Sequence, residues 1–265
     1  MNDYPIVAGS ALFTLVDPSK GHEVAYNRWY ERDHFYAGCM IGPWLFSGRR
    51  FVATRELKDL RFPEQNPVAQ PGTGSYLAIY WVLEGHEDEH FQWASEQVHW
   101  LYDHGRGFAE RSHVHTVLFD HQTTRYREAD PVPLALALDH PYRGLVSVFL
   151  DRAEGVDPAE LDAWLDQEGL PGNLTGTGVA SAASFAPRPR EGDVTQNAPM
   201  DLGSLPGGPE RSLQLFFLET DPREIWDTFL AYGDQIAASG LATLALAAPF
   251  LPTIPGTDRY TDELW

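Results

Sequence analysis

Hydrophobic residues in the first half of the chain switch between the two-residue period of a strand and the 3.6-residue period of a helix. An apolar run is followed by an amphipathic helix, two more apolar runs separated by a proline- and glycine-rich loop at 57–74, a second helix and a last run. This β-α-β-β-α-β order predicts a ferredoxin-like unit. The predicted strands are residues 9–16, 44–54, 75–83 and 112–119, and the predicted helices are residues 22–38 and 86–104.

The same order of elements begins again after a proline-containing stretch at 121–142. Residues 186–210 are rich in proline and glycine, which predicts a long loop. For the end of the chain, contact of Trp265 with a neighbour and an unordered terminus are both left open. The predicted strands are residues 143–150, 178–185, 212–218 and 241–246, and the predicted helices are residues 157–167 and 221–238.

One side of the first helix carries aromatic residues and ends in a histidine. Tyr26, Tyr30 and His34 are spaced four residues apart, and Trp29 and Ala37 extend the same side. Core packing is one explanation of such a stripe. The alternative is a site, because histidine exchanges protons near neutral pH and a neighbouring tyrosine hydroxyl donates hydrogen bonds.

Two segments carry a resemblance to a known family. Asn27–His34 (N-R-W-Y-E-R-D-H) and Gly42–Phe51, which contains R-R-F, resemble the first helix and second strand of the EthD-like dimeric α+β-barrel proteins. The family has Pro-Gly where this chain has Gly42-Pro43, and the resemblance is weak in the second half. It implies paired ferredoxin-like sheets, in a family of cofactor-independent monooxygenases, isomerases, cyclases, lyases and members without known activity.

The two halves of the chain can be superposed as sequences. Trp164 falls at the place of Trp29, and the apolar run 213–217 falls at the place of 77–81. Because an apolar sheet face needs a partner to bury it, we predict an α+β fold in which two tandem ferredoxin-like units form an intramolecular dimeric α+β barrel. The predicted parts are a first unit at 1–125, a linker at 126–142, a second unit at 143–251 and a C-terminal tail at 252–265.

Charge and composition exclude several classes of function. The formal net charge is −19 and the sequence pI is about 4.7, which argues against binding to nucleic acid or to an anionic membrane. The single cysteine, Cys39, permits neither an intramolecular disulfide nor a cysteine-rich metal site, and its apolar neighbours predict a buried thiol. Without a signal-like start or a run of roughly 20 apolar residues, a cytoplasmic location is expected.

Histidine is distributed unevenly. All ten histidines lie at or before His140, and Gly169 takes the place of His34 in the superposed second half. A histidine-based site is therefore expected in the first unit alone, with the second unit as a structural partner. The resemblance also bears on haem, because haem-binding relatives with duplicated units place a proximal histidine in the second unit, where this chain has none.

Other charged and titratable residues offer further candidates. Strand alternation predicts that His113 and His115 share a face, where a metal site is one possibility and contact with a substrate is the one we favour. His90 sits among acidic residues at a helix start, which predicts a solvated position. Arg49 and Arg50 point to opposite sides of their strand, so one is expected to face a cavity and bind a carboxylate or phenolate.

These observations predict an enzyme without a cofactor or bound metal, a lyase or isomerase acting on a small aromatic or polyketide-like molecule. His34 is expected to transfer the proton, assisted by Tyr30 and Tyr26. The alternatives are a cofactor-free monooxygenase and a non-catalytic binding protein for a hydrophobic metabolite. A small-molecule substrate is the expected partner, and a homodimer is left open. The predicted substrate contacts are Trp29, Arg49, Arg50, Phe51, Tyr80, Trp81, His113 and His115.

Overall fold

The computed structural model describes residues 5–188, 200–203 and 208–265. Eight antiparallel strands close into a ring in the order β1-β3-β2-β8-β5-β7-β6-β4. The four strands of each half are neighbours, and the two sheets join where β2 meets β8 and β4 meets β6. The predicted duplicated α+β barrel is confirmed. The strands are β1 (Ala8–Pro18), β2 (Leu45–Val52), β3 (Tyr76–Leu83), β4 (Arg111–Tyr126), β5 (Gly144–Arg152), β6 (Val179–Pro187), β7 (Arg211–Leu218) and β8 (Ala242–Pro252).

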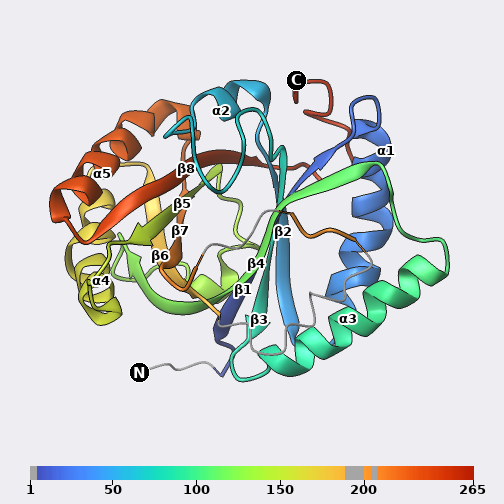
Figure 1. Cartoon of the computed structure of the whole chain (residues 1–265), viewed down its shortest axis with the longest axis horizontal. Coiled ribbons are helices and arrows are strands. Elements are labelled where there is room, and N and C mark those ends of the chain that lie inside the picture. Colours follow the sequence, from blue (N-terminus) through green and yellow to red (C-terminus); the bar gives the residue numbers. More distant parts are fainter. Residues whose placement is uncertain (1–4, 189–199, 204–207) are drawn as a thin grey trace.

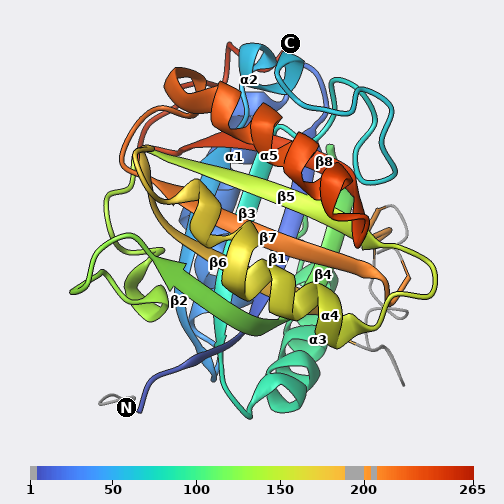
Figure 2. The same cartoon turned by 90° about the vertical axis from the view of Figure 1, so that its left-hand side faces the viewer.

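The helices cover the outside of the ring on two opposite sides (Figure 1). On the first sheet lie α1 (Glu23–Trp29) and α3 (Glu87–Asp103), and on the second lie α4 (Pro158–Trp164) and α5 (Trp226–Ser239), which Figure 2 shows in front of the strands. The barrel interior and the first helix layer share one apolar cluster, whereas the second helix layer forms a cluster of its own. The layer between helices and sheet is therefore separate from the barrel interior in the second unit and continuous with it in the first.

Two β-bulges recur at equivalent places in the two units. The register of β2 with β3 shifts between Leu45 and Ser47, and that of β6 with β7 shifts between Val179 and Ser181. The register of β1 with β4 shifts after Leu15, and the register of β5 with β8 shifts at the corresponding residue. Because a bulge fixes which residues oppose each other, the two units can be compared residue by residue.

Two strands are longer than the sequence predicted. β4 continues from 119 to Tyr126, so the start of the predicted linker is strand, and β8 continues from 246 to Pro252. Both extensions pair with the other unit, β4 with β6 and the end of β8 with β2. The paired residues are far apart in the sequence, so the local hydrophobic pattern does not reveal them.

The predicted first helix is not α-helical over its whole length. After α1, two π-helical segments follow, Tyr30–His34 and Tyr36–Met40. The second unit has the π-helical segment Leu165–Gly169 at the same place, directly after α4. A π-helix bonds residue i to residue i+5, so it changes which side chains meet along the helix. The short helix α2 (Arg55–Asp59) extends into the predicted loop 57–74.

The C-terminal tail lies against the first unit. The backbone N–H of Arg55 donates to the carbonyl of Glu263 over 2.8 Å, and Leu264 is fully buried. The indole N–H of Trp265 donates to Glu23 Oε1 over 2.6 Å, so the last residue contacts α1 of its own chain.

Part of the predicted loop at 186–210 cannot be compared, since residues 189–199 and 204–207 lie outside the described residues. Within the described ranges, none of the helices is both long enough and apolar enough to cross a membrane.

Candidate functional site

The aromatic stripe predicted on the first helix packs against the first sheet. Tyr26 and Tyr30 are buried, with ring centroids 5.7 Å apart, and the ring of Tyr30 meets that of His34 edge to face at 5.2 Å. Burial raises the pKa of Tyr26 to about 12 and raises the pKa of Tyr30 further. Both phenols are therefore protonated at neutral pH.

The π-helical segment brings Trp29 onto His34. The two rings stack with centroids 4.6 Å apart and planes 16° apart, and they are five residues apart in the sequence, as the π-helical repeat requires. A Cβ added to Gly38 would lie 2.7 Å from His34 Nδ1, so the imidazole packs directly on that glycine. Burial, together with the charges of Arg111, His113 and Arg50, lowers the pKa of His34 to about 3, which keeps the ring neutral.

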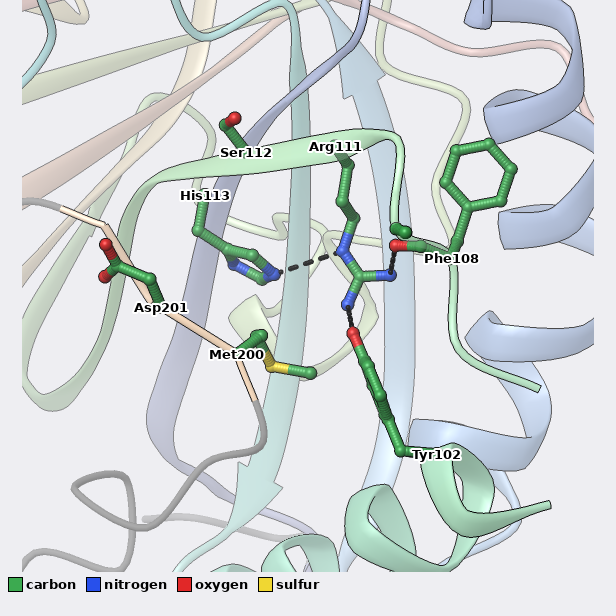
Figure 3. Close-up of a pocket in the computed structure, with 8 residues that line it drawn as sticks. Tyr102, Phe108, Arg111, Ser112, His113, Met200 and Asp201 are labelled. Atoms are coloured by element: carbon green, nitrogen blue, oxygen red, sulfur yellow. Dashed lines mark hydrogen bonds between the residues drawn. The ribbon is translucent and has the colours of Figure 1, made fainter. Parts of the chain in front are cut away.

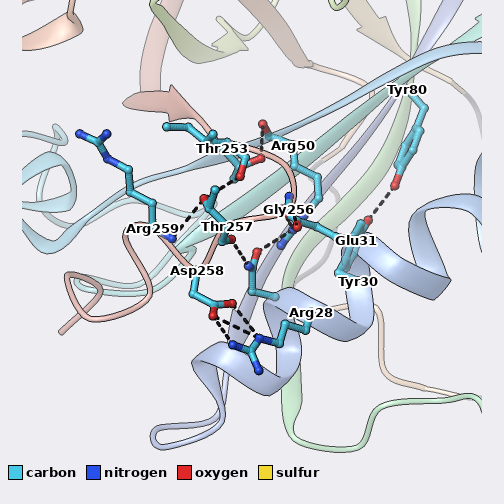
Figure 4. Close-up of polar contacts among 12 residues, drawn as sticks. Arg28, Tyr30, Glu31, Arg50, Tyr80, Thr253, Gly256, Thr257, Asp258 and Arg259 are labelled. Atoms are coloured by element: carbon cyan, nitrogen blue, oxygen red, sulfur yellow. Dashed lines mark hydrogen bonds and ion pairs between the residues drawn. The ribbon is translucent and has the colours of Figure 1, made fainter.

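A buried guanidinium lies on the sheet beneath the same helix (Figure 4). Arg50 is 5% exposed and donates to Asn27 Oδ1 over 2.9 Å and to Glu31 Oε1 over 3.3 Å. Its charge lies 4.5 Å from the ring centroid of Tyr30, a cation–π contact. The hydroxyl of Tyr30 shares a 2.9 Å hydrogen bond with that of Tyr80. Arg50 is thus the arginine that faces the helix layer of the first unit.

The structure divides the predicted pocket wall between two faces of the sheet. Arg49 lies over the ring of Phe51, and Trp81 meets Phe185 of the other unit at 5.8 Å, so these side chains face the barrel interior. Tyr80 and Trp29 lie on the helix side. Neighbouring strand residues point to opposite faces, so the proposed wall of Trp29, Phe51, Tyr80 and Trp81 cannot surround one ligand.

A β-bulge also separates the two strand histidines. His115 pairs with Leu15 and His113 pairs with Val16, so Val114 is an extra residue that reverses the alternation. His115 is fully buried in the barrel interior, 5.3 Å from Phe149. His113 faces the helix layer. The predicted common face is therefore wrong.

A cavity of about 340 Å³ opens between the end of α3, the start of β4 and residues 200–203 (Figure 3). None of the three residues of the predicted catalytic set lines it, and His113 is the predicted contact that does. Phe108, which lines it, stacks on Trp29 with centroids 5.3 Å apart, so Trp29 connects the cavity to His34. The lining residues are Tyr102, Phe108, Ala109, Arg111, Ser112, His113, Met200 and Asp201.

Arg111 is the central cation of this cavity, and the sequence analysis did not single it out. Its Nε donates to His113 Nε2 over 3.3 Å, Nη1 to the carbonyl of Phe108 over 3.3 Å, and Nη2 to the hydroxyl of Tyr102 over 3.0 Å. The guanidinium also lies 4.6 Å from the ring centroid of Trp29. Burial and the charge of Arg111 lower the pKa of His113 to about 3, although Asp201 opposes part of that effect.

The second unit has the same layer between its helices and its sheet, but without the polar side chains of the candidate site. The helices align through Trp29 and Trp164, and the strands align through the paired bulges. Seven polar side chains of the first layer have an apolar or small counterpart in the second, and most of these counterparts belong to its apolar cluster. In place of Tyr26, Tyr30, His34, Arg50, Tyr80, Arg111 and His113, the second unit has Leu161, Leu165, Gly169, Ser184, Phe216, Ala242 and Leu244.

One histidine that was expected in solvent is buried. His90 on α3 is 1% exposed, and burial lowers its pKa to about 4, partly opposed by the carbonyl of Pro43. The acidic neighbours in the sequence suggested otherwise, but His90 lies on the buried side of that turn, together with Glu87. Cys39 is buried as predicted, and burial raises its pKa to about 11.

Metal binding finds no support in the described part of the chain. No group of three or more histidine, cysteine, aspartate or glutamate side chains there is placed to hold an ion. Because His113 and His115 lie on opposite faces of β4, they are not placed to bind one metal ion together.

The fold is shared with solved structures at low sequence identity. A protein described as anthrone oxidase-like matches with a TM-score of 0.52 at 10% identity over 95% of both chains. A dye-decolorizing peroxidase from Bacteroides thetaiotaomicron matches with a TM-score of 0.52 at 10% identity, over 99% of this chain and 98% of that one. A haem-bound DypB variant from Rhodococcus jostii matches with a TM-score of 0.52 at 13% identity, over 99% and 97%. No family model and no curated protein matches the sequence.

The haem of such structures does not fit the second unit of this chain. Haem iron needs an axial side chain such as histidine, cysteine, methionine or tyrosine. The second unit has no histidine or cysteine, and Gly169 and Leu244 stand where the first unit has histidines. Its single tyrosine, Tyr232, packs on Phe216 with ring centroids 5.4 Å apart, and its single methionine, Met200, lines the cavity of the first unit. Its helix layer is filled by buried side chains that include Phe216, Trp226 and Phe229.

Proposed function

We propose that the chain is a cofactor-independent enzyme that oxidises a small aromatic or polyketide-like molecule with molecular oxygen in the cavity of the first unit. The observation that carries this proposal is the cavity of the first unit, which is lined by His113 and Arg111, where the second unit has Leu244 and Ala242. Burying charged and polar groups costs stability, and proteins accept that cost most readily at functional sites.

The choice of oxidation over the lyase or isomerase reaction predicted first is supported by the fold match to an anthrone oxidase-like protein. At 10% identity that match shows the fold alone, so it selects the reaction to test rather than the substrate. The EthD-like resemblance of the first half is consistent with the same choice, because that family includes cofactor-independent monooxygenases.

His113 is the proposed proton acceptor, since it is the histidine that lines the cavity. In the free protein it is a weak base, because burial and Arg111 lower its pKa. An anion that pairs with Arg111 offsets that positive charge and makes His113 more basic. Its 3.3 Å contact with Arg111 Nε is long, so this hydrogen bond is weak and its loss when Nε2 takes the proton costs little. His34 is a positioning residue that holds Trp29.

The reaction follows from a methylene group between two aromatic rings. Loss of one methylene proton to His113 gives a carbanion whose charge is delocalised onto a substrate oxygen beside Arg111. The carbanion transfers one electron to oxygen, and the two radicals combine into a carbon–oxygen bond. The resulting peroxide takes a proton, then loses the remaining C–H proton and its outer hydroxide as the O–O bond breaks. One methylene and one oxygen molecule give one ketone and one water.

The test is oxygen consumption by the purified protein with an anthrone as the probe, in the presence of a metal chelator. We expect one oxygen molecule consumed for each ketone formed. His113→Gln should lower kcat by about 100-fold or more, the usual loss when a general base is removed. His22→Gln changes an exposed histidine and should leave the rate unchanged. Conversion at the same rate without oxygen would instead support the lyase or isomerase reading.

Binding without turnover is the second candidate function. The stacked rings of Phe108 and Trp29 favour it, because such a wall binds planar molecules without any chemistry. Saturable quenching of tryptophan fluorescence by the probe, with no oxygen uptake and no product, would assign the chain to this class.

A further inference from the structure

We infer that the cavity selects ligands that carry an acidic oxygen on an aromatic ring, a phenolate, enolate or aromatic carboxylate, and that Arg111 binds this oxygen in the ground state. The inference relies on the proposed function only for the location of the site. It names the class of ligand, which the oxidation chemistry by itself leaves open.

The first observation is the number of hydrogen-bond donors on Arg111. A guanidinium has five N–H groups, and three of them are used by His113, Phe108 and Tyr102. Nη1 and Nη2 each retain one N–H without an acceptor among the described residues. Two adjacent nitrogens with one free donor each match the fork that binds a carboxylate or phenolate oxygen.

The second observation is that no described carboxylate forms an ion pair with Arg111. The chain has 38 acidic residues and 19 basic ones, and several of its arginines form ion pairs, as Arg106 does with Asp33 and Arg125 with Asp166. A partly buried cation with only neutral partners keeps most of its attraction for an anion. Arg49 and Arg61 also lack a carboxylate partner, but they donate to backbone carbonyls away from the cavity, so Arg111 is the described cation of this kind that lines it.

The third observation is that Arg111 is held in one orientation. Its Nε–H donates to His113 Nε2, so that nitrogen is the unprotonated one and Nδ1 carries the hydrogen. His113 Nδ1 then donates to Thr116 Oγ1 over 2.9 Å. This assigned tautomer links the guanidinium to the strand, which reduces the entropy lost when a ligand binds.

The fourth observation concerns the part of the ligand beside the anion. Phe108 lines the cavity and stacks on Trp29, and Trp29 also lies under the guanidinium of Arg111. A flat apolar surface therefore borders the cation. An aromatic ring with an acidic oxygen at its edge is complementary to both features at once.

Asp201 is a negative charge at the cavity, so removing it and removing Arg111 should change the binding of an anion in opposite directions. It is the one carboxylate among the described lining residues and its side chain is exposed. In Figure 3 it lies on the far side of His113 from Arg111. An anionic ligand is repelled by it, so its removal should strengthen binding while removal of Arg111 should weaken it.

The experiment uses 4-nitrophenol, whose phenolate absorbs light differently from its neutral form, and 4-nitroanisole, which cannot ionise. With the unaltered full-length protein, the bound phenol should lose its proton at a pH at least about one unit lower than in water, which corresponds to about tenfold tighter binding of the anion. Arg111→Gln should abolish that shift, and Asp201→Asn should enlarge it. Arg223→Gln removes the same charge on the second unit and should change nothing.

Equal binding of 4-nitroanisole and 4-nitrophenolate by the unaltered protein would overturn the inference, whatever the stability of the Arg111 variant. So would a shift that persists in a folded Arg111→Gln protein. The outcome is independent of oxidation: a preference for the phenolate without oxygen consumption removes the proposed reaction and keeps the anion site. Oxygen consumption without a preference for the phenolate would keep the proposed reaction and remove the anion site.

Discussion

His90 should make the protein sensitive to mild acid. It is 1% exposed on α3, and burial lowers its pKa to about 4, although the carbonyl of Pro43 opposes part of that effect. In the unfolded chain the pKa is about 6.5. The folded protein therefore binds this proton less readily than the unfolded chain. Its contribution to stability is fully present above pH 6.5 and is lost as the pH falls toward 4.

The size of the loss follows from the two pKa values. At 1.36 kcal/mol for each pH unit, a difference between about 6.5 and about 4 is worth about 3 kcal/mol below pH 4. About 2 kcal/mol of this is lost between pH 7.5 and pH 5. Other buried histidines, such as His34, add to the total loss of the unaltered protein, so a difference between variants is needed to isolate His90.

The assay is the free energy of unfolding from urea titrations at pH 7.5 and pH 5, for the unaltered protein and His90→Leu. The variant should lose about 2 kcal/mol less between the two pH values. Phe91→Leu, on the next residue of α3, should lower stability at both pH values by about 1 kcal/mol without changing their difference. If His90→Leu loses as much stability in acid as the unaltered protein, the buried neutral histidine is not the cause and the reasoning fails.

Two further predictions concern the helix layer of the first unit. Gly38→Ala places a methyl group 2.7 Å from Nδ1 of His34, so we expect the imidazole to leave the face of Trp29, seen as loss of the upfield ring-current shift of its protons in NMR spectra. An unchanged shift would show that the stack tolerates the methyl group. Truncation of residues 254–265 removes the contact of Thr257 with Asn27 of α1 and that of Gly256 with Glu31 of the following π-helical segment, and hydrogen exchange should accelerate in α1 but not in α4. Equal protection of α1 before and after truncation would contradict a stabilising role for the tail.

The fold was predictable because its information is local and repeated. Each strand and helix shows its own period, and Trp29 and Trp164 mark the same place in two copies of one pattern. The ends of β4 and β8 were not predictable, because they depend on pairing with the other unit. Local patterns identify elements, and only the closed ring determines how far each strand extends.

The candidate site was predicted less well, for two geometric reasons. A π-helical segment stacks Trp29 on His34, and the extra residue Val114 places His113 and His115 on opposite faces of β4. Neither irregularity has a signal in hydrophobic periodicity. The sequence did contain a signal for Arg111, because superposition of the two repeats places Ala242 at its position. That alignment depends on the register of the bulged strands, which the sequence alone does not reveal.

The same irregularities separate the architecture of the unit from its chemistry. The π-helical segment and both bulges occur in each unit, including the second, which lacks counterparts of Arg111 and His113, so they belong to the fold rather than to the site. What differs is the side chains placed on that common frame. A barrel made from two identical chains must carry the same residues twice, whereas a duplicated chain can bury polar groups on one side only. Here the apolar layer of the second unit stabilises the barrel, and the first unit bears the desolvation cost of Arg50, Arg111 and His113.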